Sequence, residues 1–106
     1  MNKYRDKSGF EINKAVFVAA KINHEDTSLH DGKVFYGDGA NWIEFDPCNN
    51  PADAMPIVIE NKISILHKKN DGIWYAYHPF QSVEHENFYR AAMELFLMMK
   101  DAENEK

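Results

Sequence analysis

The segment that most constrains the fold is the last long apolar stretch, residues 87–101. Its spacing predicts an α-helix, and its hydrophobic side chains occupy nearly the whole circumference of that helix. The main stripe comprises Phe88, Ala91, Ala92, Leu95, Phe96 and Met99, with Leu97 and Met98 on its flank. Such a helix must be covered on several sides. We expect the rest of the chain to cover it, and a homodimer through this C-terminal helix is the alternative.

Two segments predict the elements with the clearest local signals. A capping box formed by Ser8 and Glu11 precedes apolar residues at helical spacing and predicts a helix over 9–21. Strands over 63–67 and 73–77 flank the turn sequence Asn-Asp-Gly and predict a β-hairpin. In its second strand, aromatic residues occur on both faces, so we expect the sheet to be covered on both sides, or covered on one and adhesive on the other.

The remaining segments carry weaker signals. Short strands are predicted over 33–36 and 41–45, a polar loop over 23–32 and a connector over 78–86. The predicted fold class is α+β, with three helices packed on a small antiparallel sheet in an α-β-α sandwich-like arrangement. A chain of 106 residues predicts a single domain, residues 1–106, with an ordered core of about 8–101.

The stretch FDPCNNPADAMPIVIENKISI, residues 45–65, poses a choice between a structural joint and a chemical site. Either Asn50 or Asp53 caps a helix that ends near residue 61. With Asn50 as the cap, Pro56 lies inside the helix and kinks it; with Asp53, the helix starts late and Pro56 is harmless. As a site, the turn would offer the side chains of Asp46, Cys48, Asn49, Asn50 and Asp53.

Cys48 is the single cysteine, so no disulfide forms within the chain. The helix start that follows it would lower the pKa of its thiol, whereas Asp46 and Asp53 disfavour a thiolate. We expect a packed, unreactive thiol. A second candidate surface consists of aromatic residues that could pack in the core or bind a protein, namely Trp42, Phe45, Trp74, Tyr75 and Tyr77.

Composition and motifs argue against several classes of function. The formal charge of −5 and the lack of a basic cluster make nucleic-acid binding an unfavoured alternative. No nucleophile elbow, zinc spacing or phosphate-binding loop occurs, so we predict no catalytic residues, no cofactor and no metal. No apolar stretch is long enough to span a membrane, and we expect a cytoplasmic protein.

Four landmarks resemble a phage family: SGFEINKAV near the start, the central FDPCNNPADAMPIVIENKISI, the aromatic strand IWYAY and the closing RAAMELFLMM. Together they are similar to NinX-type proteins of lambdoid phages and enterobacterial prophages. The family often has tryptophan where this chain has Met55, so no function of an aromatic ring at that position carries over. The resemblance implies an accessory role in phage growth or host interaction, and it brings no catalytic residue or cofactor.

These observations lead to one main hypothesis and two alternatives. The main hypothesis is a non-enzymatic accessory protein that binds a host or phage protein in the cytoplasm of the host bacterial cell. The first alternative is a small-ligand binder or enzyme with a pocket at the turn over 46–53. The second is a phage protein associated with nucleic acid.

Overall fold

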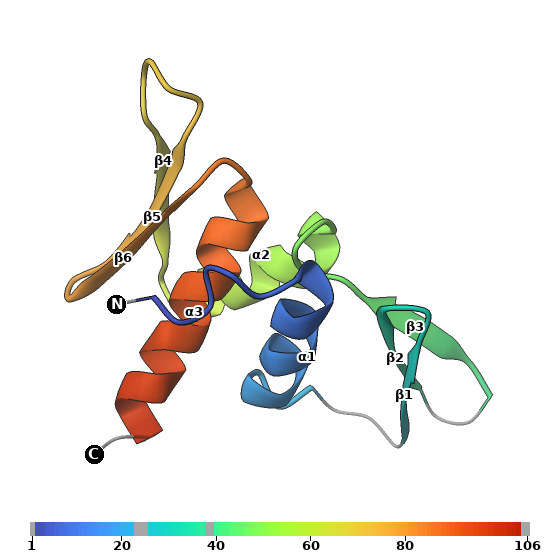
Figure 1. The fold of residues 1–106 in the computed structure, drawn as a ribbon. Coiled ribbons are helices and arrows are strands. Elements are labelled where there is room, and N and C mark those ends of the chain that lie inside the picture. The colour runs from blue at the N-terminus through green and yellow to red at the C-terminus, as the bar shows by residue number, and fades with distance from the viewer. Residues whose placement is uncertain (1, 23–25, 38–39, 105–106) are drawn as a thin grey trace.

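The computed structural model describes residues 2–22, 26–37 and 40–104, and it has the α+β fold that the sequence predicts. The elements follow in the order α1 (Gly9–Ala19), β1 (Asp26–His30), β2 (Lys33–Gly37), β3 (Trp42–Phe45), α2 (Pro51–Glu60), β4 (Ser64–His67), β5 (Trp74–His78), β6 (Gln81–His85) and α3 (Phe88–Asn104). The strands form two antiparallel three-stranded sheets, β1-β2-β3 and β4-β5-β6, instead of the one sheet expected. We call them the N-terminal sheet and the C-terminal sheet. Figure 1 shows them at opposite ends of the molecule, with the helices between them.

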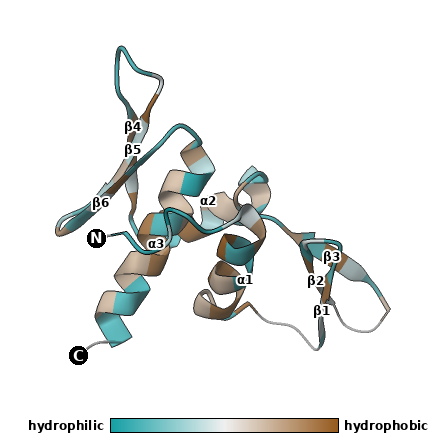
Figure 2. Ribbon diagram, viewed as in Figure 1, coloured by the Kyte–Doolittle hydropathy of each residue, from teal (hydrophilic) through white to brown (hydrophobic). Residues whose placement is uncertain are grey.

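Helix α3 is the centre of the core, as its apolar circumference predicts. Seven consecutive residues, 91–97, are buried. The helix contacts α1, α2, β5 and β6, so different elements cover its different sides. Figure 2 shows hydrophobic residues along its middle and hydrophilic residues at its C-terminal end. Most of the apolar stripe is therefore buried inside the protomer, and its half-buried members are Phe88, Met98 and Met99.

Helix α1 begins as the capping box predicts. The amide of Glu11 donates to the Ser8 hydroxyl at 3.1 Å, and the amide of Ser8 donates to the Glu11 carboxylate at 3.3 Å. These bonds satisfy two amide groups that a helix start otherwise leaves unpaired. The hydrogen bond from Ser8 is the largest cause of a lowered pKa at Glu11.

The prediction of a loop over 23–32 is wrong for residues 26–30, which form β1 (residues 23–25 lie outside the described residues). β1 and β2 are joined by the two-residue turn Asp31-Gly32, where both φ values are positive, 51° and 71°. Two-residue hairpins use this geometry because its twist matches that of the strands. Asp-Gly is a typical sequence for such a turn, so the signal was present, but the polar residues around it favoured a loop.

The prediction of a connector over 78–86 is also wrong in part, because residues 81–85 form β6. His78 pairs with Gln81 across the two residues Pro79 and Phe80. No glycine or asparagine marks this turn, and only Val83 of β6 is fully buried. The strand is specified mainly by pairing with β5 and packing on α3, which local sequence does not reveal.

Asn50, not Asp53, caps α2. Its side chain accepts a hydrogen bond from the amide of Ala52 at 3.0 Å, and Pro51 occupies the first helical position. Pro56 therefore lies inside the helix, where its ring nitrogen has no hydrogen to donate to the preceding turn. The late start considered from the sequence is wrong, because the Asp53 carboxylate is engaged elsewhere: it accepts from the amide of Asp46 at 2.9 Å.

The N-terminal segment before α1 is attached to α3 by a buried ion pair. Arg90 binds Glu94, one turn further along the helix, and the Glu94 side chain is 1% exposed. The terminal nitrogen Nη2 of Arg90 donates to the backbone carbonyls of Tyr4 at 3.0 Å and Lys7 at 2.6 Å. The side-chain amide of Asn2 donates to Oε1 of Glu94 at 2.6 Å, the carboxylate oxygen that the Arg90 ion pair does not use. Together these bonds hold the segment before Ser8 against the central helix.

Candidate functional site

The turn between β3 and α2 brings together all five residues of the predicted turn site, and their polar groups mainly bind one another. Asp46 accepts two hydrogen bonds from the Asn49 side chain, each at 3.2 Å, while Asn50 caps the helix. The backbone amide of Asp46 also donates to the Asp53 carboxylate, so the side chains of the turn form a compact hydrogen-bonded network. These contacts account for the motif as a joint between a strand and a helix.

A sixth residue, Asn13 of α1, completes the network and was not identified from the sequence. Its amide donates to the Asp46 carboxylate at 2.8 Å, and its carbonyl oxygen accepts from the Cys48 amide at 3.2 Å. Asn13 is buried although it is polar. A signal existed, since Asn13 lies beside Ile12 on the apolar side of a predicted helix, and a buried asparagine needs partners.

Cys48 is buried, with 4% of its surface exposed, and its thiol lies 3.9 Å from the carbonyl oxygen of Gly9. Burial raises the pKa of the thiol to about 12; Asp46 and Glu94 raise it further, and Arg90 partly opposes them. The thiol therefore stays protonated at neutral pH. The structure gives the packed thiol that the sequence favours.

We predict that Cys48 reacts with Ellman's reagent at pH 8 at least about a hundredfold more slowly in the folded protein than in urea, because only an accessible thiolate attacks. Because the pKa of the thiol is higher in the folded protein, the stability is full below the unfolded pKa of about 8.5 and falls as the pH rises from there toward the folded pKa of about 12. Stopped-flow absorbance in native and denaturing buffer checks the ratio. Equal rates would show that the thiol is accessible in the folded state.

The five aromatic residues of the predicted surface lie in four different places. Phe45 is buried on the inner face of the N-terminal sheet, in edge contact with Phe17 of α1, and Trp42 is exposed on the other face. Trp74 is on the inner face of the C-terminal sheet, where its ring packs edge-on against Phe88 with centroids 5.1 Å apart. Only Tyr75 and Tyr77 share a surface.

That surface is the outer face of the C-terminal sheet, and we call it the tyrosine face: Leu66, Tyr75 and Tyr77. Leu66 pairs directly with Tyr75, and the two tyrosine rings lie 5.3 Å apart. Helix α3 packs on the opposite face of the sheet, where it contacts β5 and β6 (Figure 1). The sheet is thus covered on one face, which was one of the two arrangements expected from its aromatic content. Leu66 was not identified from the sequence, because its outward direction depends on strand register.

Charged groups border the tyrosine face. Lys68 forms an ion pair and hydrogen bond with Glu84, which raises the pKa of Lys68, and its ammonium lies 5.6 Å from the centre of the Tyr75 ring. Phe80, in the turn between β5 and β6, is 92% exposed. Aromatic groups with a polar border are typical of the centre of a protein interface.

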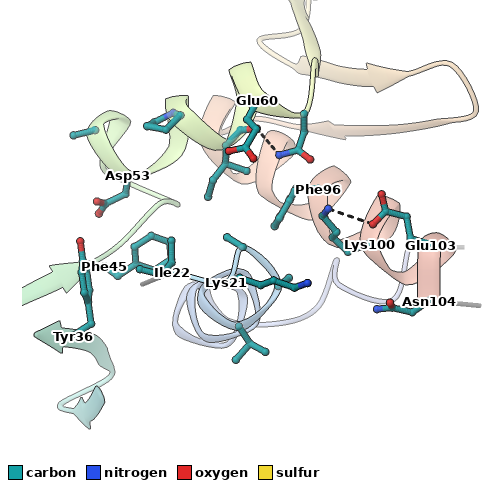
Figure 3. A pocket seen from close by; sticks show the side chains of 17 residues that line it. Lys21, Ile22, Tyr36, Phe45, Asp53, Glu60, Phe96, Lys100, Glu103 and Asn104 are labelled. Atoms are coloured by element: carbon teal, nitrogen blue, oxygen red, sulfur yellow. Dashed lines mark hydrogen bonds and ion pairs between the residues drawn. The ribbon is translucent and has the colours of Figure 1, made fainter. Parts of the chain in front are cut away.

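A hollow of about 620 Å³ lies between the C-terminal end of α1, α2, the end of α3 and the N-terminal sheet (Figure 3). Its apolar lining includes Ile22, Phe45, Ile57 and Phe96. The charged groups around it are Lys21, Asp53, Glu60, Lys100 and Glu103. Lys100 is paired with Glu103 at 3.2 Å, and Asp53 is bound to the turn. The described residues of the lining include neither histidine nor cysteine, and they offer apolar and ionic contacts.

Two further observations concern the described part of the chain. No group of three or more His, Cys, Asp or Glu side chains there is close enough to hold a metal ion. None of its helices combines the length and the hydrophobicity needed to cross a bilayer.

Comparison with known proteins identifies the family. The family model described as Bacteriophage P22, NinX matches residues 3–100, a range that includes all four sequence landmarks. No curated protein and no solved structure matches the chain. Because the family match covers nearly the whole length, the chain belongs to the bacteriophage P22 NinX family.

Proposed function

We propose that this phage protein is a non-enzymatic accessory protein that acts by binding another protein in the cytoplasm of the host cell. The partner is a phage or host protein that packs on the tyrosine face. Membership of a phage family supports the accessory role. The observation that carries the proposal is the tyrosine face itself.

The tyrosine face has the chemistry of an interaction surface. Tyr77 is 37% exposed and Leu66 45% exposed, although both are large apolar groups on a regular strand. Tyrosine gives a partner a large apolar contact area and a hydroxyl that can form hydrogen bonds, and it is enriched among residues that dominate binding energy. The pair Lys68 and Glu84 adds opposite charges at the border, which would help to orient a partner.

The proposal is tested by affinity capture from phage-infected cells with the tagged protein and a variant carrying Tyr75→Thr and Tyr77→Thr. Threonine keeps a high preference for strands, so the sheet should be retained while the rings are removed. We expect the dissociation constant of the captured partner to be at least about ten times higher for the variant than for the wild type, because the variant lacks two central aromatic groups. Titration of the purified partner by calorimetry measures that ratio.

Trp42→Thr is the matched control, since it removes an exposed ring from the other sheet. It should leave the affinity unchanged. Equal affinity of the wild type and the double tyrosine variant, with both folded by circular dichroism, would contradict the proposal.

A further inference from the structure

A second surface, far along the chain from the tyrosine face, follows the outer side of α1. Three hollows, of about 620, 550 and 360 Å³, meet at Val18, which is 75% exposed. We call the second and third of them together the α1 groove. The described lining residues that carry the argument below are Lys14, Val18, Lys21, Ile22 and Leu29.

The apolar part of the α1 groove exists because α1 covers only part of the N-terminal sheet. Leu29, Val34 and Phe45 pair across the three strands and therefore share one face. Val34 and Phe45 are buried, whereas Leu29, on the edge strand β1, is 56% exposed. Leu29 and Val18 thus border the same hollow without burying each other. Folding leaves a strip of aliphatic surface between a helix and a sheet.

The charge of the α1 groove is opposite to that of the protein. Lys7 precedes α1, Lys14 lies within it and Lys21 follows it, and all three line the α1 groove. Lys14 and Lys21 line the hollow beside β1, and none of the described residues lining that hollow is acidic. Glu11 lies in the neighbouring hollow, 4.0 Å from Lys7. The whole chain carries −5, so this basic strip stands out locally.

Lys21 is held in an unfavourable backbone conformation. It follows the end of α1 with φ at 55°, in the left-handed region that glycine adopts most easily. Lys21 lines two of the hollows. Lys62 follows the end of α2 with the same geometry, φ at 56°, but lines none of these hollows. It is therefore a matched control for Lys21.

We propose that the α1 groove binds an acidic amphipathic helix of a partner protein. Aliphatic side chains of that helix, spaced three and four residues apart, pack on Val18, Ile22 and Leu29. Its carboxylates pair with Lys14 and Lys21. Helix α1 has 11 residues and is roughly 16 Å long, which a partner helix of about three turns would match. This surface is separate from the tyrosine face, so the inference does not depend on the function proposed above.

The test is selection from a library of random 16-residue peptides on the full-length protein, followed by fluorescence polarisation with the selected peptides. We expect enrichment of Asp and Glu together with Leu, Ile and Val at helical spacing, and binding that weakens as salt is added. Val18→Asp, which puts a negative charge against the acidic partner, and Lys21→Gly, which removes a positive charge, should each weaken binding at least tenfold. Lys62→Gly should leave binding unchanged.

The two glycine variants also separate binding from folding. Each replaces a strained lysine by the residue that suits a positive φ, so neither should lower the melting temperature. The double tyrosine variant should bind the selected peptides as the wild type does, which distinguishes failure of this inference from failure of the proposed function.

Three results would overturn the inference. One is selection of peptides without acidic and aliphatic residues, or of peptides that Val18→Asp and Lys21→Gly bind unchanged. Another is a dimer in analytical ultracentrifugation that Val18→Asp dissociates, because the groove would then be occupied by a second copy. The last is binding to vesicles containing phosphatidylglycerol that Val18→Asp abolishes, which would identify an anionic lipid surface as the occupant.

Discussion

Replacing Arg90 by alanine is expected to lower the free energy of unfolding by about 3–5 kcal/mol, because it leaves the Glu94 carboxylate buried without its charged partner. The Glu94 side chain is 1% exposed and that of Arg90 11% exposed, so solvent has little access to this ion pair. The same change removes the donor to the carbonyls of Tyr4 and Lys7 and should release the segment before α1. Urea denaturation followed by circular dichroism measures the loss.

The matched control removes both charges together. Arg90→Met combined with Glu94→Leu fills similar volume without a buried charge, and such replacements are often neutral or stabilising. We therefore expect the double variant to recover most of the stability that Arg90→Ala loses. Hydrogen exchange at the amides of residues 4–7 should rise in both variants, because both lose the donor to this segment. A loss under about 1 kcal/mol in Arg90→Ala would mean that the carboxylate finds another partner or water.

Replacing Asn13 by alanine is expected to lower the free energy of unfolding by about 2–3 kcal/mol, since it breaks two hydrogen bonds of the buried turn. The Cys48 amide loses its acceptor at 3.2 Å, and the Asp46 carboxylate loses a donor at 2.8 Å. Among the described residues, the joint between β3 and α2 then keeps only the weak contact from the Cys48 thiol to the Gly9 carbonyl as a polar connection to α1. Chemical denaturation gives the stability, and the amide exchange rate of Cys48 reports the local effect.

Asn49→Ala provides the comparison, because the Asn49 side chain also donates to Asp46 but is exposed. Water can take its place, so we expect a change within about 0.5 kcal/mol. Similar losses in the two variants would show that the number of bonds to Asp46 matters more than their burial.

The family and many of the elements could be predicted from the sequence because their signals are local or contiguous. Ser8 and Glu11 predict the start of α1 through bonds three residues apart. The apolar circumference of residues 87–101 predicts a buried helix, and the structure places α3 at the centre. The four landmarks that identify the NinX family are unbroken stretches of chain. None of these inferences depends on knowing which residues are in tertiary contact.

The candidate site was predicted less completely, because its members depend on which faces the fold covers. The predicted surface combined Trp42, Phe45 and Trp74 with two tyrosines, but only the tyrosines are together in space. Strand alternation places Tyr75 and Tyr77 on one face, yet only the packing of α3 decides that this face is the open one. Leu66 joins them through strand pairing, which its own sequence neighbourhood does not reveal.

The sequence by itself determined the α+β class, the start of α1, the buried central helix and the family, since caps, turns and periodicity act over a few residues. Tertiary structure alone decided that the strands form two separate sheets. It also decided that Asn13 forms a hydrogen bond with the turn after β3, and that Arg90 and Glu94 bind the N-terminal segment. Finally, it decided that the described residues leave the tyrosine face and the α1 groove accessible. The physical reason is that burial and pairing join residues that are distant in sequence, and their energies depend on the neighbours that the complete fold brings together.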